Sequence, residues 1–210
     1  MEENRRPIKT RSHGWAKALS AWCVAKDISP NQISVASVCF ALVGAGTLML
    51  FPALVGPIIC LVCIQMRLVC NLIDGMVAIE GGQKSAVGSL FNEFPDRIAD
   101  SLFLVALGYA AGFGELGWFA ALAAALTAYV RVFGGSLGLP QSFMGPMAKQ
   151  HRMAVMTLGL IAHCVESTLY GTHNALVITL VIIIVGSLMT CGTRTLSINK
   201  ALKEQAHADQ

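Results

Sequence analysis

The feature that most constrains the fold of this chain is a succession of long apolar segments. A helix needs about 20 apolar residues to cross the hydrocarbon core of a bilayer. Only 13% of the residues are charged and 55% are hydrophobic, whereas soluble domains carry roughly twice that charge. We therefore predict an all-α integral membrane protein with six transmembrane helices near residues 31–51, 53–78, 87–113, 116–134, 149–166 and 174–196.

A short amphipathic helix is predicted before the first apolar segment. Trp15, Leu19, Trp22 and Cys23 recur at helical spacing, with lysines among their polar neighbours. This pattern is typical of a helix that lies in the membrane interface. Pro30 then favours the start of the first membrane helix. The chain is thus divided into a cytoplasmic N-terminus with the interfacial helix, a six-helix membrane domain and a cytoplasmic C-terminal tail, at residues 1–30, 31–198 and 199–210.

The basic residues indicate the orientation in the membrane. Lysine and arginine precede the first segment, flank the turn between the second and third, lie between the fourth and fifth, and follow the sixth. The connections at 52, 112–117 and 167–173 contain neither. Because cytoplasmic loops carry the excess of lysine and arginine, both termini are predicted to be cytoplasmic, in a bacterial inner membrane. The net charge of +3 is too small to indicate a nucleic-acid partner.

Five of the twelve acidic residues fall between positions 74 and 100, on the second and third segments. Ionisable groups inside a membrane are costly and usually functional. Asn71 and Asp74 share one helix face, and Asn92, Asp96 and Asp100 are spaced at i, i+4 and i+8 on the next helix. We expect these oxygens to converge near the cytoplasmic boundary. Carboxylate and amide oxygens suit a hard cation such as Mg²⁺ or Mn²⁺.

Basic residues near these acids allow two interpretations. The acids could be structural and paired with Arg67, Lys84 or Arg97. Three further basic residues lie on the cytoplasmic side near the acids, and the two at the start of the fifth segment could serve as membrane anchors. The first of the three lies within an apolar segment and therefore needs an anionic partner. These three residues are Arg131, Lys149 and Arg152.

The spacing of the polar residues resembles the signature of the CDP-alcohol phosphatidyltransferases, Asp-x2-Asp-Gly-x2-Ala-Arg-x8-Gly-x3-Asp-x3-Asp. The signature aligns without a gap, and five of its eight fixed positions match. Asparagine replaces the first and third acids, and Ile79 replaces the arginine. The segment 28–34 is also similar to the start of the first membrane helix in that family. The aligned residues are Asn71, Asp74, Gly75, Ala78, Ile79, Gly88, Asn92 and Asp96.

The resemblance implies transfer of a phosphatidyl or related group from a CDP-linked lipid donor to an alcohol acceptor, with release of CMP, in phospholipid biosynthesis. It also implies a homodimer surrounded by membrane lipids and a divalent cation, Mg²⁺ or Mn²⁺. Asp96 would be the catalytic base. The metal ligands would be Asn71, Asp74, Asn92, Asp96 and Asp100, and the substrate-binding residues Gly75, Ala78, Gly88, Arg131, Lys149 and Arg152.

The two asparagines leave several alternatives open. The site could hold one metal ion, bind two more weakly, or be rebuilt in a shifted form by Asp100 and Glu93. We expected Glu93 to be the poorer substitute, because it lies about 100° around the helix from Asn92. The chain could also be a family member that binds metal or CDP-lipid but acts on a different or poor substrate. A transporter or a structural subunit is the remaining alternative.

Overall fold

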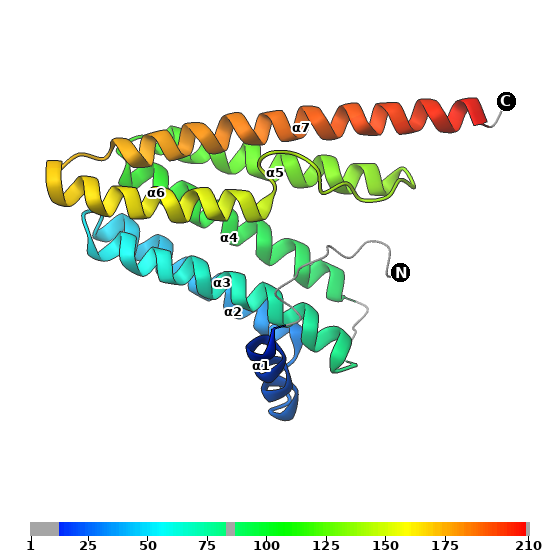
Figure 1. Cartoon of the computed structure of the whole chain (residues 1–210), viewed down its shortest axis with the longest axis horizontal. Coiled ribbons are helices and arrows are strands. Elements are labelled where there is room, and N and C mark those ends of the chain that lie inside the picture. The colour runs from blue at the N-terminus through cyan, green and yellow to red at the C-terminus, as the bar shows by residue number, and fades with distance from the viewer. Residues whose placement is uncertain (1–12, 83–86, 209–210) are drawn as a thin grey trace.

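The computed structural model describes residues 13–82 and 87–208, and this part of the chain is helical without any strand (Figure 1). Each of the six predicted segments coincides with one long helix, and a shorter helix precedes them. The last helix continues well past the predicted end of its segment. The helices are α1 (Gly14–Ala25), α2 (Pro30–Leu50), α3 (Val55–Glu80), α4 (Gly88–Ala110), α5 (Gly114–Ser136), α6 (Lys149–Tyr170) and α7 (Asn174–Ala208).

Five of the described helices are long and apolar enough to cross a membrane. These are α2, α3, α5, α6 and α7, whose most apolar stretches have mean hydropathies between 1.3 and 2.5. The protein is therefore an integral membrane protein. The third predicted segment forms α4, which is not among the five because four charged residues lie in it, at positions 93, 96, 97 and 100.

The start of α2 is fixed by a capping box. The backbone N–H of Gln32 donates to Ser29 Oγ at 3.3 Å, and the backbone N–H of Ser29 donates to Gln32 Oε1 at 2.9 Å. Pro30 is the first helical residue, where its missing N–H costs nothing and its fixed φ favours the helix. The predicted start of the first apolar helix at this point is confirmed.

Helix α1 lies across one end of the bundle and packs against α3 (Figure 1). It buries Ala16, Ser20 and Cys23, which follow one another at i, i+4 and i+7. Trp15 and Trp22 remain 47% and 53% exposed. The helix therefore uses its small residues for packing and turns both large aromatic side chains away from the bundle.

The long helices pack closely where glycines face a neighbouring helix. A Cβ atom on Gly44 of α2 would lie 2.8 Å from Cys63 Cβ of α3 and 2.9 Å from a ring carbon of Phe103 of α4. A Cβ atom on Gly159 of α6 would lie 2.0 Å from Thr179 Oγ1 of α7. Small residues at such positions let membrane helices approach closely.

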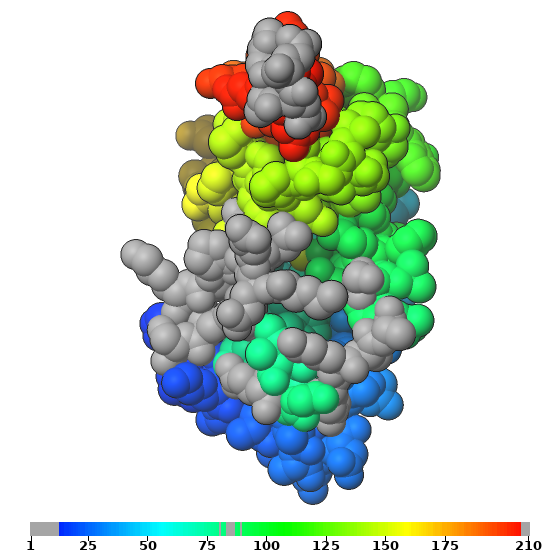
Figure 2. All heavy atoms as spheres, turned by 90° about the vertical axis from the view of Figure 1, so that its right-hand side faces the viewer, coloured from blue at the N-terminus to red at the C-terminus, as the bar shows by residue number. Residues whose placement is uncertain are grey.

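Figure 2 looks onto one end of this bundle, with α1 and α2 at the bottom and α7 at the top.

The segment between α5 and α6 is held against α7 by polar contacts. The backbone N–H of Met147 donates to Thr190 Oγ1 at 2.9 Å. Arg194 of α7 donates to the carbonyl oxygen of Met144 at 2.9 Å and to that of Thr127 in α5 at 2.5 Å. These contacts fix the point at which α6 begins, and with it the first basic residues of that helix.

Candidate functional site

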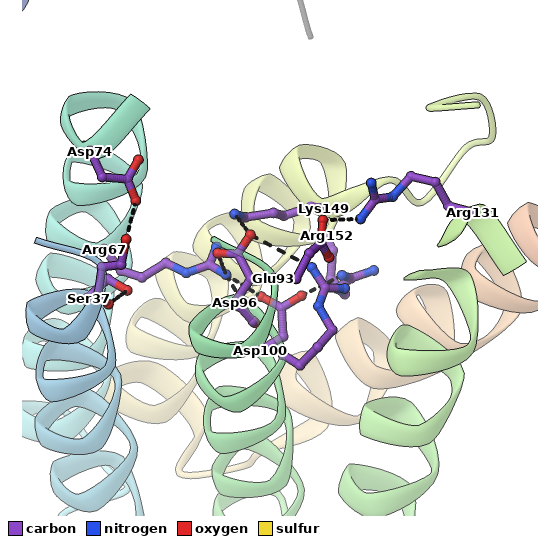
Figure 3. A network of polar contacts seen from close by, with 11 residues as sticks. Ser37, Arg67, Asp74, Glu93, Asp96, Asp100, Arg131, Lys149 and Arg152 are labelled. Atoms are coloured by element: carbon purple, nitrogen blue, oxygen red, sulfur yellow. Dashed lines mark hydrogen bonds and ion pairs between the residues drawn. The ribbon is translucent and has the colours of Figure 1, made fainter. Parts of the chain in front are cut away.

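Two buried carboxylates of α4 are bridged by an arginine of α3. Asp96 and Asp100 lie one helical turn apart and are 6% and 2% exposed. Arg67 has no exposed surface, and its Nη2 atom lies 3.1 Å from Asp96 Oδ1 and 2.7 Å from Asp100 Oδ1 (Figure 3). A single guanidinium nitrogen of α3 thus joins both acids of α4.

The first turn of α6 supplies two more cations to the same acids. Lys149 Nζ donates to Asp96 Oδ2. Arg152 is completely buried, and its Nη2 atom lies 2.5 Å from Asp100 Oδ2 while its Nη1 atom donates to the carbonyl oxygen of Met147 at 3.2 Å. Each carboxylate is therefore held between a cation of α3 and a cation of α6. Buried ions persist when they are paired and hydrogen-bonded in this way.

A third acid of α4 extends the cluster toward α5. Glu93 Oε1 lies 2.5 Å from Nη2 of Arg131. The Nη1 atom of the same arginine donates to Gln141 Oε1. The guanidinium carbon of Arg131 lies 5.3 Å from the centre of the Phe143 ring. The arginine predicted to need an anionic partner therefore has one, and that partner is Glu93 (Figure 3).

Asp74 is separate from this cluster (Figure 3). It is 5% exposed, and its Oδ2 atom accepts a hydrogen bond from Ser34 Oγ of α2 at 2.8 Å. Within residues 13–82 and 87–208 it forms no salt bridge. Asn71, one turn earlier on α3, has a buried Nδ2 atom for which the described part of the chain offers no acceptor. Asp74 is thus a buried carboxylate bonded to a neutral hydroxyl.

The predicted convergence of five oxygen ligands is only partly present. Asn92 is exposed, whereas Asp96 and Asp100 on the same helix are buried. Steps of four residues drift by about 40° each, so that Asn92 and Asp100 point about 80° apart, while Glu93 and Asp100 point about 20° apart. Asn92 therefore points further from Asp100 than its spacing suggested, and Glu93 lies nearer to the direction of Asp100. In the described chain, no three His, Cys, Asp or Glu side chains cluster closely enough to hold a metal ion.

Of the basic residues proposed as structural partners, Arg67 pairs with both acids and Arg97 Nη2 lies 3.8 Å from Asp96 Oδ2. Lys84 lies outside the described residues. The predicted substrate-binding residues Gly75, Ala78 and Gly88 are all partly buried. Ile79, at the position of the arginine in the signature, is 41% exposed.

A cavity of about 200 Å³ lies between α5, the segment before α6, and α7. Arg131 and Arg194 line it together with Ser142. From the sequence, Arg194 was only a marker of orientation in the membrane. Its position in an apolar helix could have identified it as a candidate site residue, as the same feature did for Arg131.

Two relatives of known activity are similar to this chain in sequence. An archaetidylinositol phosphate synthase of Aeropyrum pernix is 33% identical over 123 residues, which cover 58% of this chain and 60% of the relative. A phosphatidylinositol phosphate synthase of Streptomyces avermitilis is 26% identical over 201 residues, which cover 90% of this chain and 79% of the relative. The chain thus matches less than two thirds of the archaeal protein's length. No protein-family model matches it.

Two crystal structures of the phosphatidylinositol phosphate synthase of Mycobacterium tuberculosis share the fold. One has CDP-DAG bound and the other is a complex with manganese and citrate. Both align with a TM-score of 0.70 at 16% identity and cover 87% of this chain, and they are themselves covered to 92% and 88%. Related sequences and a shared fold agree with the spacing of the signature residues on α3 and α4, and they support the resemblance of the chain to the CDP-alcohol phosphatidyltransferases.

Proposed function

We propose that this protein transfers a phosphatidyl or related substituted phosphate group from a CDP-linked lipid to a hydroxyl acceptor and releases CMP. The observation that carries the proposal is Asp74, a buried acid of the signature without a cationic partner in the described chain. A buried carboxylate is costly unless a positive charge lies near it. A cation held there would face the phosphates of a bound nucleotide. The names of the two sequence relatives support the same reaction class.

Asp74 and Asn71 fit a divalent cation, Mg²⁺ or Mn²⁺. Mg²⁺ is commonly held by one or two carboxylates together with substrate phosphates. Asp74, which forms no salt bridge in the described chain, would supply the carboxylate, and the amide oxygen of Asn71 would be a second ligand. When bound, the cation would neutralise charge on the diphosphate and favour departure of CMP. The manganese in the related mycobacterial structure supports this assignment.

The residues of the cluster would divide the remaining tasks. Asp96, whose side chain is 8% exposed and paired with Lys149, would accept the proton of the attacking hydroxyl. A general base must lie within hydrogen-bond reach of the proton that it accepts. Asp100 would be the partner that keeps Arg67 and Arg152 in place. Gly75, Ala78 and Gly88 would leave room for the nucleotide between α3 and α4.

The acceptor would bind in the cavity lined by Arg131 and Arg194. Arginine favours phosphate because its donors form a planar fork. The two sequence relatives are named for products that contain inositol phosphate. We therefore propose a phosphorylated polyol as the acceptor class, with its phosphate beside Arg131 and its hydroxyl toward Asp96. Lys149 and Arg152 would maintain the cluster between the two subsites.

For the membrane topology, we propose that α4 also crosses the bilayer, which gives six transmembrane helices. It has 23 residues and packs against α2 and α5, both of which are apolar enough to span. Its acids are buried and paired rather than facing lipid. The tryptophans of α1 would lie in the interface. By the positive-inside rule the site and both termini face the cytoplasm, in an inner membrane, and the family resemblance favours a homodimer.

The proposed reaction is tested with purified protein in lipid nanodiscs. CDP-diacylglycerol, Mn²⁺ or Mg²⁺, and a panel of acceptors (inositol phosphate, glycerol phosphate, inositol and serine) are supplied, and CMP is measured. We expect CMP release that depends on metal and acceptor, and its loss in Asp74→Asn. Lys200→Ala, which changes an exposed residue of α7, is the matched control. Absence of CMP with every acceptor in the unmodified protein would refute the proposal.

A member of the same family that turns over a different or poor substrate remains the second candidate. It is favoured by the pairing of Asp96 with Arg67 and Lys149, because both carboxylate oxygens of this acid are already bonded to cations. Binding of CDP-diacylglycerol without CMP release would distinguish it. A transporter is disfavoured because such sites use broken helices near the midplane, whereas α3 is continuous from Val55 to Glu80.

A further inference from the structure

The charges at the signature positions do not match two divalent cations. Asn71 and Asn92 leave Asp74 and Asp96 as the acids among the four aspartate positions of the signature. Asn92 is exposed and does not join the cluster. Asp100 is buried beside Asp96 and adds one carboxylate, but α3 and α6 already supply cations to both of these acids. Asp74 is the acid of this set that lacks a positive partner in the described chain.

Arg67 lies where a second cation would have to bind. Its Nη2 atom is 2.7 Å from Asp100 Oδ1 and 3.1 Å from Asp96 Oδ1, and no part of the side chain is exposed. Arginine stays protonated even when buried. A metal ion bound to the same two oxygens would be repelled by this unscreened guanidinium. The Asp96–Asp100 side of the site therefore does not fit a divalent cation while Arg67 is in place.

The remaining donors of Arg67 are not used within the described chain. Its Nε and Nη1 atoms are buried without an acceptor there, as is Nδ2 of Asn71 one turn further along the same face of α3. Buried donors are normally paired, so three unpaired ones close together indicate an acceptor that comes from outside the protein. The phosphate oxygens of a diphosphate are acceptors that also favour a guanidinium.

We propose that Arg67 takes the place of one of two divalent cations. The site binds a single divalent cation on the Asn71–Asp74 side, and the guanidinium of Arg67 supplies the second positive centre on the Asp96–Asp100 side. The free N–H groups of Arg67 donate to a phosphate oxygen of the donor. This inference rests on the proposed function, because it assigns the group that neutralises the donor diphosphate.

The number of bound ions tests this proposal without turnover. Free Mn²⁺ is followed by electron paramagnetic resonance while it is titrated into purified protein in nanodiscs, with and without CDP-diacylglycerol. We expect about one Mn²⁺ per chain in the unmodified protein, and about two in Arg67→Gln, which frees the Oδ1 atoms of Asp96 and Asp100. Arg67→Lys keeps the charge and should stay at about one. Asp74→Asn should lose the tight ion. Two ions in the unmodified protein, or an unchanged count in Arg67→Gln, overturns the proposal.

Thermal unfolding provides a second readout if Arg67→Gln folds poorly. The variant has two buried acids with fewer partners, so we expect a lower Tm in EDTA and a larger rise in Tm on adding Mn²⁺ than in the unmodified protein. If it is recovered only when purified with Mn²⁺, that recovery supports the proposal. An equal rise in both proteins, or no recovery with Mn²⁺, contradicts it. If the ion count follows expectation but no acceptor yields CMP, the proposed reaction fails and the role of Arg67 stands.

Discussion

Arg152 Nη2 of α6 and Asp100 Oδ2 of α4 lie 2.5 Å apart, and their side chains are only 1% and 3% exposed. Within the described chain, α4 packs against α2, α5 and α7, whereas α6 packs against α3 and α7. The two helices are instead joined by this ion pair and by Lys149 with Asp96. The polar cluster is therefore a structural connection between α4 and α6 as well as a candidate site.

Removing one partner of this pair should destabilise the protein strongly. Arg152→Met leaves Asp100 with Arg67 alone, and loss of one member of a buried pair costs about 3–5 kcal/mol. We expect a clear decrease in Tm, measured by thermal unfolding in detergent. The variant Arg152→Met/Asp100→Leu should recover part of the loss, because apolar pairs can replace buried ion pairs.

The matched control for that experiment is the pair Lys200–Glu204 at the exposed end of α7. Its two side chains are 80% and 68% exposed, and surface pairs contribute little to stability. Lys200→Met should therefore leave Tm unchanged. A similar decrease in Tm for Lys200→Met and Arg152→Met would show that the Arg152–Asp100 pair has no special role.

Arg131 should affect the acceptor and not the donor. Arg131→Gln removes the charge beside the cavity of α5 and α7 but leaves Asp74 and Asp96 intact. If a bidentate contact to phosphate is lost, KM for a phosphorylated acceptor should rise by at least about tenfold, which corresponds to about 1.4 kcal/mol. KM for CDP-diacylglycerol should change by less than about twofold. Equal increases in both KM values would contradict the assignment of the cavity.

Close packing of α6 on α7 should make Gly159 intolerant of a side chain. A Cβ there would meet Thr179 Oγ1 at 2.0 Å, and overpacking costs about 1–3 kcal/mol. Gly159→Ala should lower Tm, and Thr179→Ala in the same protein should restore part of it. Gly46→Ala is the control, since nothing lies within 4 Å of a Cβ at Gly46. A lower Tm for Gly46→Ala would mean that replacing glycine by alanine lowers Tm in these helices in general, and that the contact with Thr179 is not the cause.

The position of α1 relative to the membrane can be measured through its tryptophans. Trp15 and Trp22 are half exposed, and Trp118 of α5 can be removed by Trp118→Phe. In this variant, lipids brominated near the headgroup should quench the remaining fluorescence more strongly than lipids brominated near the chain ends, because an interfacial helix lies at the headgroup boundary. The reverse order would show that α1 is not interfacial.

The helices could be predicted from the sequence because their determinants are local. The apolar segments set α2 to α7, and Ser29, Pro30 and Gln32 define the first boundary through contacts within four residues. The helical spacing also indicated that Asp96 and Asp100 lie one turn apart on the same helix. These features depend on neighbours along the chain, which a sequence displays directly.

The partners of the acids could not be predicted in the same way. Arg67 and Asp100 are 33 residues apart in the chain, and Arg152 and Asp100 are 52 apart. Arg67 was one of three candidate partners, and only the three-dimensional arrangement of α3 and α4 brings its guanidinium to both acids. The exposure of Asn92 follows from a helical drift of about 40° per four residues, which accumulates over two turns and exchanges Asn92 for Glu93 on the buried face.

Helix α7 has 35 residues, which corresponds to about 52 Å at 1.5 Å per residue. A bilayer including its headgroups is about 40–45 Å thick, and Figure 1 shows the end of α7 extending past the other helices. The last turns, with Lys200, Lys203 and Glu204, therefore stand in water as a continuous rod from the membrane core. A soluble domain fused in helical register after Ala208 would be rigidly coupled to the transmembrane bundle and would serve as an orientation marker for electron cryomicroscopy.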